Sequence, residues 1–177
     1  TRGYLKIQDG CDNFCSYCII PYVRGRVRSR DIEDIKKEAE HMASKGIKEV
    51  VLTGIHLDSY GKDKEDLSII NVIAELNEIN GIRRIRLGSL EPKIITDHFV
   101  TEIKKYSKLC PHFHMSLQSG SDKVLQDMNR RYDSKIFIDA IVKLRNSIPD
   151  VEITTDIIVG YPTETEEDFQ KSMEIVR

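Results

Sequence analysis

The sequence predicts an α/β protein whose parallel sheet forms an open part of a β/α barrel. Strand-like and helix-like segments alternate along its 177 residues, without a hairpin signal between neighbouring strands. Right-handed crossovers through helices would make such strands parallel. The most unusual residues directly follow the strands, and in a parallel β/α fold these positions meet at one face. Because all five strands contribute such residues, a barrel mouth fits better than the single crevice of a doubly wound sheet.

Five short apolar segments, rich in β-branched and aromatic residues, are the predicted strands. They are residues 4–8, 49–53, 83–87, 113–117 and 153–159. Each is followed by a segment with helical spacing of apolar residues, so five βα units are expected.

The helices are predicted from this spacing and from capping residues at their starts. They are expected to begin near Asp31, Asp66, Thr96, Ser121, Asp133 and Thr165. In the last helix, Asp168 follows Thr165 by three residues, which forms a loose capping box. Phe169, Met173 and Val176 are expected to form its apolar face.

Length and composition fit one domain with a substantial core. The net charge of −2 provides no overall basic excess, so any contact with nucleic acid must come from a local patch. No apolar run is long enough to span a membrane, and no signal peptide is evident. The missing initiator Met and the end within a helical segment suggest a piece of a longer protein.

Three clustered cysteines are the most specific chemical feature. Cys11, Cys15 and Cys18 follow the first strand with the spacing C-x3-C-x2-C. Four thiolates would saturate a 4Fe-4S cluster, whereas three leave one iron open for a small molecule. A zinc site is the alternative, but it needs a fourth ligand and usually consists of two separated pairs. Candidates for that fourth ligand are Cys110, His56, His112 and His114.

At these cysteines the chain resembles the radical SAM superfamily. The signature of that superfamily is C-x3-C-x-aromatic-C after the first strand of a partial β/α barrel, and Tyr17 is the aromatic residue here. The resemblance implies that residues 1–177 form a radical SAM core whose sixth strand is missing. It also implies that S-adenosylmethionine binds the open iron and is split to a 5′-deoxyadenosyl radical, while the protein orients this cofactor.

Further segments resemble the methylthiotransferases within that superfamily. They are KIQDGC (6–11), IIP (19–21), RGR (24–26), RSR (28–30), QSGS (118–121), DIIVGYP (156–162) and ET (164–165). The segments LTGIHL (52–57) and SYG (59–61) resemble the branch that adds a methylthio group to C2 of N6-threonylcarbamoyladenosine beside the tRNA anticodon. Branches acting on isopentenyladenosine in tRNA, or on an aspartate of a ribosomal protein, are alternatives. A zinc-stabilised nucleic-acid-binding module is the alternative without this chemistry.

The resemblance implies that loops after the strands bind the cofactor, with no catalytic residues beyond the cluster ligands. The expected cofactor-binding residues are Tyr17, Thr53, Gly54, Ile55, His56, Ser89, Glu91, Gln118, Ser119 and Gly160. Carbonyl groups in the turn after the second strand would accept hydrogen bonds from the cofactor's ammonium group, and Gly54 would allow close approach. Polar side chains after the third and fourth strands would hold its carboxylate and ribose hydroxyl groups.

A run of arginines predicts contact with RNA phosphates at the barrel rim. It consists of Arg24, Arg26, Arg28 and Arg30, and Arg130 and Arg131 have a weaker claim of the same kind. The alternative is a solvated loop whose guanidinium groups pair with Asp31, Glu33 or Asp34.

The resemblance also implies partners and further domains. The expected partners are tRNA and an electron donor of the flavodoxin or ferredoxin type. A longer protein would carry an N-terminal domain whose second 4Fe-4S cluster supplies sulfur, and a C-terminal RNA-binding TRAM domain. The protein is expected to be a cytoplasmic monomer without membrane contact. These 177 residues alone are expected to split the cofactor but not to thiolate tRNA.

Overall fold

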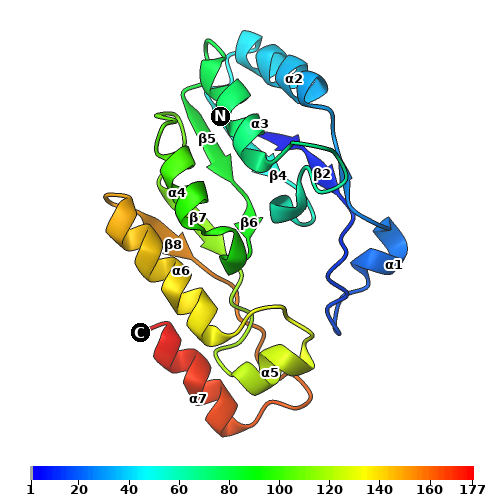
Figure 1. Ribbon diagram of the computed structural model, residues 1–177, viewed down its shortest axis with the longest axis vertical. Coiled ribbons are helices and arrows are strands. Elements are labelled where there is room, and N and C mark those ends of the chain that lie inside the picture. The colour runs from blue at the N-terminus through cyan, green and yellow to red at the C-terminus, as the bar shows by residue number, and fades with distance from the viewer. Residues whose placement is uncertain (1) are drawn as a thin grey trace.

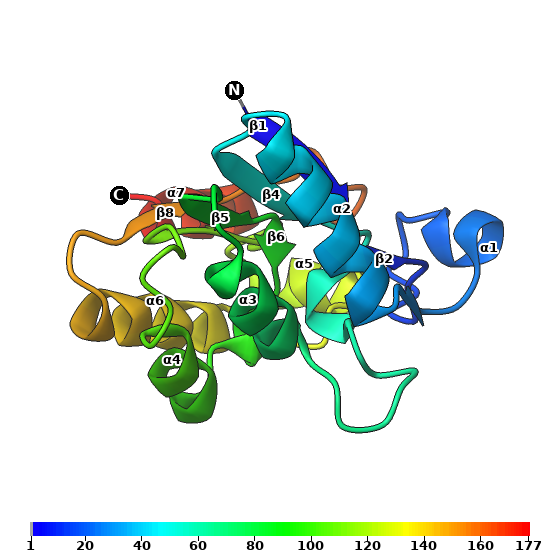
Figure 2. The same cartoon turned by 90° about the horizontal axis from the view of Figure 1, so that it is seen from above.

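The computed structural model describes residues 2–177, and its larger helices cover one face of a curved sheet (Figures 1 and 2). The strands are β1 (Arg2–Lys6), β2 (Gln8–Asp9), β3 (Arg28–Ser29), β4 (Glu49–Thr53), β5 (Arg84–Leu87), β6 (Ser89–Leu90), β7 (His112–Met115) and β8 (Glu152–Thr154). The helices are α1 (Ile20–Arg24), α2 (Ile32–Ser44), α3 (Ile69–Glu78), α4 (Asp97–Ile103), α5 (Asp122–Asp127), α6 (Ser134–Ser147) and α7 (Glu166–Ile175). Two 3-10 turns are η1 (Leu57–Ser59) and η2 (Pro92–Ile94). Among residues 2–177, no helix combines the length and the apolar character needed to cross a membrane.

The main strands are all parallel, in the orders β1-β4-β5 and β6-β7-β8. Only Gly88 separates β5 from β6, and its N–H donates to the Leu52 carbonyl at 2.9 Å. A parallel bridge between Ile85 and Leu109 connects the two groups of strands. The predicted open β/α barrel is therefore confirmed, with its third strand divided into β5 and β6.

One apolar core lies between the sheet and the helices. Leu5, Leu52 and Ile85 contribute side chains that are fully buried, and the first two are partners across β1 and β4. Val72 and Leu76 cover this region from α3. Each such side chain contributes roughly 1.5–3 kcal/mol through burial. This packing holds the strands in place, so that loops following several of them line one cavity.

Some element bounds differ from the prediction for local reasons. A small antiparallel pair, β2 with β3, was not predicted because two residues per strand provide no periodic signal. Helix α3 begins at Ile69 rather than after Asp66, because the Ser68 N–H donates to the Asn71 side chain and caps the helix there. Strand β8 ends at Thr154, well before the predicted residue 159.

Helix α7 buries two polar residues that were not predicted, while Phe169 and Met173 of the predicted apolar face are only partly buried. Asp168 is 3% exposed and Ser172 is fully buried, while Val176 is 48% exposed. The reason is its neighbour, since Asp168 and Ser172 face the loop after β7, whereas Ile175 packs against the apolar core. The Ser172 hydroxyl accepts a hydrogen bond from the Gly120 N–H, and Asp168 accepts one from the Ser121 hydroxyl.

Glu49 joins three strands at the amino end of the sheet. Its side chain is 6% exposed and pairs with the Nε atoms of Arg2, Arg84 and Arg86 at 2.6, 2.7 and 3.0 Å. Burial opposes ionisation, but the guanidinium groups outweigh it and lower the pKa of Glu49 from 4.5 to about 2. Because the folded pKa is the lower one, this stabilisation is present above pH 4.5 and is lost as the pH falls toward 2.

We expect Glu49→Gln to lower the free energy of unfolding by about 2 kcal/mol at neutral pH, because it leaves three guanidinium groups without their carboxylate. The variant should also lose less stability than the wild type between neutral pH and pH 3. Urea denaturation at both pH values measures the two effects. Glu38→Gln is the control, since the Glu38 side chain is 41% exposed and pairs only at the surface with Arg30. Parallel pH profiles for Glu49→Gln and wild type would contradict the assignment.

Candidate functional site

A cavity of about 340 Å³ opens at the carboxyl ends of the strands, and the three clustered cysteines line it. Seven of the ten predicted cofactor-binding residues also line it: Tyr17, Gly54, Ile55, His56, Ser89, Glu91 and Gln118. The other lining residues are Asn13, Ile20, Leu90, Ser116 and Arg130. The fold therefore brings the cysteine loop together with strand β6 and with the loops after β4, β6 and β7.

Backbone contacts hold the cysteine loop over the ends of the strands. Gly10 has a positive φ of 72°, and a Cβ there would lie 1.9 Å from the carbonyl oxygen of Arg26. This close approach lets the Cys11 N–H donate to the Gly25 carbonyl at 3.1 Å. The far side of the loop is held by Asn129, whose side-chain amide donates to the Phe14 carbonyl at 2.9 Å.

Two of the three thiols each accept one hydrogen bond. Sγ of Cys11 accepts from the Asn13 N–H at 3.4 Å, and Sγ of Cys15 accepts from Nη1 of Arg130 at 3.3 Å. Burial raises the pKa of Cys11, but His56 and the Asn13 N–H outweigh it, so that the pKa is lowered overall. This favours the thiolate, which is the metal-binding form of cysteine.

The donor set fits an iron–sulfur cluster better than one zinc ion. Tetrahedral zinc would hold its sulfur ligands within roughly 4 Å of one another. In the described part of the chain, the only group of three potential ligand atoms within 4.8 Å of one another is His56, Asp58 and Glu91, so at least one pair of the cysteine sulfurs lies farther apart than 4.8 Å. Three thiols that line a cavity without all lying within zinc-ligand distance of one another suit a cubane with one open iron.

Arg130 is a site residue for which the sequence predicted only contact with RNA. Its side chain is 8% exposed, and Nη2 lies 3.0 Å from a carboxylate oxygen of Glu91. The guanidinium group also stacks 4.8 Å from the ring centre of Tyr132, and Asn13 donates to Glu91 at 2.8 Å. These contacts hold the Arg130–Glu91 ion pair beside Cys15. The sequence has no local signal for it, because Glu91 and Arg130 are far apart along the chain.

His56 and Asp58 form a buried polar pair next to Glu91. Nε2 of His56 lies 3.5 Å from Glu91 and 3.8 Å from Asp58. Burial opposes the charged imidazolium, but Cys11 and the two carboxylates favour it and raise the pKa of His56 to about 9. Burial raises the pKa of Asp58 to about 7. One oxygen of Asp58 accepts from the Glu91 N–H at 2.7 Å, so Asp58, which was not predicted, positions Glu91.

Three predicted cofactor-binding residues lie outside the lining of the cavity. The carbonyl of Thr53 accepts from the Ile7 N–H at the end of β4. Ser119 is fully buried, and its hydroxyl accepts from the Ser121 N–H. Gly160 is exposed, and its N–H donates to the Glu164 carboxylate. Cofactor binding by any of the ten residues stays a prediction.

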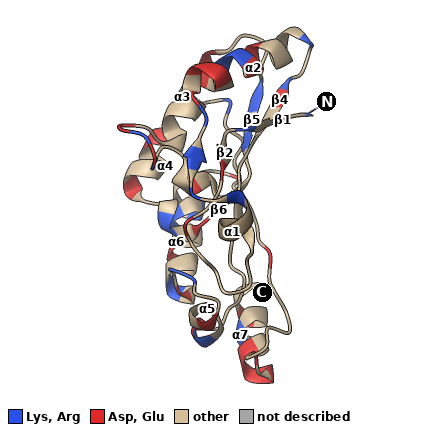
Figure 3. Ribbon diagram, turned by 90° about the vertical axis from the view of Figure 1, so that its right-hand side faces the viewer, with Lys and Arg blue, Asp and Glu red and all other residues tan. Residues whose placement is uncertain are grey.

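The four arginines of the run form ion pairs with carboxylates, as the alternative interpretation expected. Their partners, however, are not the predicted Asp31, Glu33 or Asp34. Arg24 and Arg28 pair with Asp9 at 3.1 and 3.7 Å, and Arg26 pairs with Asp12 at 3.2 Å. Arg30 pairs with Glu38 at 2.7 Å instead of with Asp31, Glu33 or Asp34. Basic and acidic segments are interspersed along the ribbon (Figure 3). Contact of this run with RNA stays a prediction.

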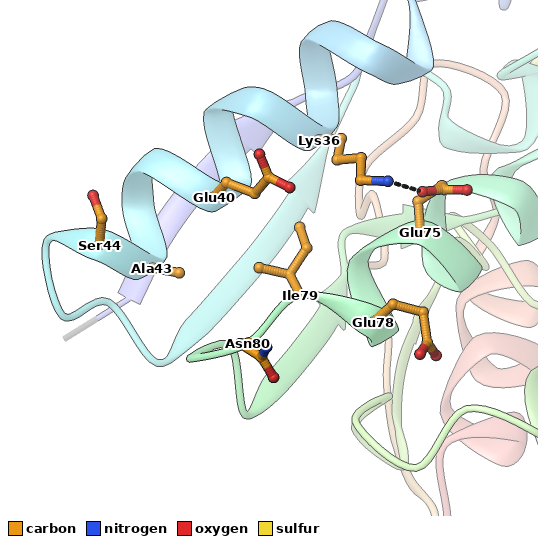
Figure 4. A pocket seen from close by; sticks show the side chains of 8 residues that line it. All are labelled: Lys36, Glu40, Ala43, Ser44, Glu75, Glu78, Ile79 and Asn80. Atoms are coloured by element: carbon orange, nitrogen blue, oxygen red, sulfur yellow. Dashed lines mark hydrogen bonds and ion pairs between the residues drawn. The ribbon is translucent and has the colours of Figure 1, made fainter.

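A separate groove of about 460 Å³ lies between α2 and α3, and no residue of the cysteine cavity lines it (Figure 4). Lys36 and Glu75 form an ion pair of 2.8 Å across it, and Glu40 and Glu78 add further acidic groups. The excess of carboxylates makes this groove unsuited to an anionic ligand.

A sequence profile of the Radical SAM superfamily matches residues 5–176. The chain belongs to the Radical SAM superfamily. The match includes the cysteine loop and every loop that lines the 340 Å³ cavity. The cavity is therefore the part of this radical SAM domain in which its chemistry is expected.

Curated relatives of this radical SAM chain are tRNA-modifying enzymes. It is 46% identical to the tRNA-2-methylthio-N(6)-dimethylallyladenosine synthase of Clostridium tetani, covering 100% of the chain and 39% of the relative. It is 47% identical to the enzyme of that name from Thermoanaerobacter pseudethanolicus, covering 99% of the chain and 37% of the relative. The chain thus spans about two fifths of the length of these relatives.

Solved radical SAM enzymes share the fold at low sequence identity. The cobalamin-dependent enzyme OxsB, solved with aqua-cobalamin and S-adenosylmethionine, has a TM-score of 0.78 and 15% identity, covering 97% of this chain and 26% of OxsB. The methyltransferase TsrM from Kitasatospora setae, solved with cobalamin and a [4Fe-4S] cluster, has a TM-score of 0.78 and 17% identity, covering 98% of this chain and 34% of TsrM.

Proposed function

We propose that this chain is the catalytic core of a radical SAM tRNA methylthiotransferase. The observation that carries the proposal is the cysteine triad at the edge of a cavity formed by the loops after the strands, in a chain 46% identical to named tRNA methylthiolating enzymes. A bound 4Fe-4S cluster would supply the electron that splits S-adenosylmethionine into a 5′-deoxyadenosyl radical. Cys11, Cys15 and Cys18 would be its ligands.

The remaining lining residues would orient the cofactor and limit solvent access. At Gly54 a Cβ would lie 2.8 Å from the Gln8 side chain, so glycine lets this turn pack against Gln8, which accepts a hydrogen bond from the His56 N–H at 2.8 Å and holds the turn beside the cavity. Glu91 offers a carboxylate for an ammonium group, and Arg130 keeps that carboxylate oriented. Tyr17 and Ile55 partly cover the opening with apolar surface.

The names of the curated relatives favour dimethylallyladenosine, that is isopentenyladenosine, in tRNA as the substrate. The initial interpretation, N6-threonylcarbamoyladenosine, is not supported by those names and becomes the second candidate. It rests on the segments LTGIHL and SYG and on a cavity lined by the cationic side chains Lys62, Lys93 and Arg131. The ribosomal-protein alternative has no supporting observation here.

The domains and partners expected from the resemblance remain part of the proposal. Because the chain spans 39% of the Clostridium tetani relative, there is room for a domain with a second cluster and for an RNA-binding domain. An electron donor of the flavodoxin or ferredoxin type, a cytoplasmic location and a monomeric state belong to the same proposal. Without a sulfur source, the 177 residues alone are not expected to thiolate tRNA.

Nucleoside mass spectrometry of tRNA tests the proposal in the organism that encodes the chain. Deleting the gene should abolish the 2-methylthio form of dimethylallyladenosine while the unmethylthiolated nucleoside accumulates. Loss of the methylthio form of threonylcarbamoyladenosine instead would establish the second candidate. If both methylthio nucleosides persist at wild-type levels, the tRNA activity is contradicted. Complementation with the intact gene is the control.

A further inference from the structure

Three basic side chains from separate loops converge on one cavity. Lys62 lies beyond η1, Lys93 lies in η2, and Arg131 lies beyond α5, yet all three line the same cavity of about 350 Å³. Within residues 2–177, none of them has a carboxylate oxygen within 4.0 Å, although Nη2 of Arg131 donates to the Asp12 carbonyl at 2.8 Å. This contrasts with Arg24 and its neighbours, which are paired.

This cationic cavity borders the cysteine cavity directly. Asn13, His56 and Glu91 line both. A group bound between the three cations would therefore lie next to the position at which a substrate meets the cofactor. The three cations come from three different loops, so the fold rather than a local charge run brings them together.

The carboxylates of the cationic cavity lie below its rim. The side chain of Asp58 is 8% exposed and that of Glu91 is 12% exposed, whereas Lys62, Lys93 and Arg131 are all exposed. Glu91 is neutralised by Arg130 at 3.0 Å. An entering ligand therefore meets positive charge first, which attracts an anion.

We propose that Lys62, Lys93 and Arg131 bind one anionic group of the RNA substrate beside the reacting adenosine. The inference rests on the proposed tRNA methylthiotransferase function and names a subsite for it. The anion has two possible sources with the same chemistry. One is a backbone phosphodiester, and the other is a carboxylate on the N6 substituent of the adenosine, such as that of a threonylcarbamoyl group.

Binding of synthetic anticodon stem-loop RNAs tests the subsite. Three RNAs carry unmodified adenosine, dimethylallyladenosine or threonylcarbamoyladenosine beside the anticodon. Fluorescence anisotropy at several salt concentrations gives the dissociation constants for the reconstituted full-length protein and for its triple variant Lys62→Ala, Lys93→Ala, Arg131→Ala. We expect the triple variant to bind roughly tenfold more weakly and with a smaller salt slope.

A second triple variant controls for the overall loss of charge. Lys37→Ala, Lys45→Ala and Lys104→Ala remove the same charge from exposed side chains that line neither the cationic nor the cysteine cavity. It should bind RNA with nearly wild-type affinity. Thermal unfolding of both variants checks that each is folded.

The pattern of loss identifies the anion. Equal weakening for all three RNAs indicates a phosphodiester, whereas weakening confined to the threonylcarbamoyl RNA indicates the carboxylate. If the cavity variant binds like the wild type, or no more weakly than the control variant, the inference is overturned. A wild-type protein that assembles its cluster but binds none of the RNAs contradicts the inference together with the tRNA part of the proposed function.

Discussion

Replacing Cys15 with alanine should abolish cluster assembly while the domain stays folded. Cys15 would supply one of three ligands, and two thiolates do not hold a 4Fe-4S cubane against loss to solvent. The fold does not depend on this ligand, because the apolar core lies between the sheet and the helices, away from the cysteine loop. Anaerobic reconstitution with iron and sulfide should load about one cluster per wild-type chain and only background iron in the variant.

Cys110→Ala is the matched control for this experiment. Cys110 is also buried, at 7% exposure, but it lies just before β7 at the opposite end of that strand from the cysteine loop. Its variant should load a cluster as the wild type does. Iron, sulfide and charge-transfer absorption measure the cluster, and circular dichroism measures the fold. Stoichiometric zinc in the wild type, with unfolding of Cys15→Ala, would instead support the zinc-stabilised module.

Gly10→Ala should destabilise the protein by about 3 kcal/mol and displace the cysteine loop. The φ of Gly10 is positive, and the added Cβ would lie 1.9 Å from the Arg26 carbonyl oxygen, which is backbone and cannot rotate away. Relieving this clash would separate Cys11 from the Gly25 carbonyl that accepts its N–H. The midpoint of thermal unfolding and the iron content after reconstitution should therefore both fall.

Gly46→Ala separates backbone strain from the clash. Gly46 has a similarly positive φ of 83°, but a Cβ there meets nothing within 4 Å. Only the strain remains, so we expect a loss of about 1 kcal/mol and unchanged cluster loading. If Gly10→Ala lost no more stability than Gly46→Ala, the close approach at Gly10 would be wrong.

Much of the fold was predictable because its signals are local. Thr96, Ser121, Asp133 and Thr165 were predicted as helix starts, and each accepts a hydrogen bond from the N–H three residues on. The short pair β2 and β3 was missed because its strands form only through contact with each other. The burial of Asp168 and Ser172 in α7 was missed because it depends on a neighbour, the loop after β7.

The candidate site was predictable where its residues directly follow strands. The cysteine motif and the turn at Gly54 could be identified because short spacing and position along the chain define them. Asn13 and Asp58 were missed because neither belongs to a recognisable motif, although both contact Glu91. Arg130 was recognised only as a charge, and its contact with Cys15 depends on a loop that is distant in sequence.

The sequence by itself determined the parallel β/α architecture and the cysteine triad, because periodicity, capping and ligand spacing are properties of short segments. Only the tertiary structure decided which basic side chains form ion pairs with carboxylates and which line a cavity. It pairs Arg24, Arg26, Arg28 and Arg30 with carboxylates, and it brings Lys62, Lys93 and Arg131 together beside the cysteine cavity. The physical reason is that a charge acts through neighbours within a few ångströms, and folding chooses those neighbours from distant parts of the chain.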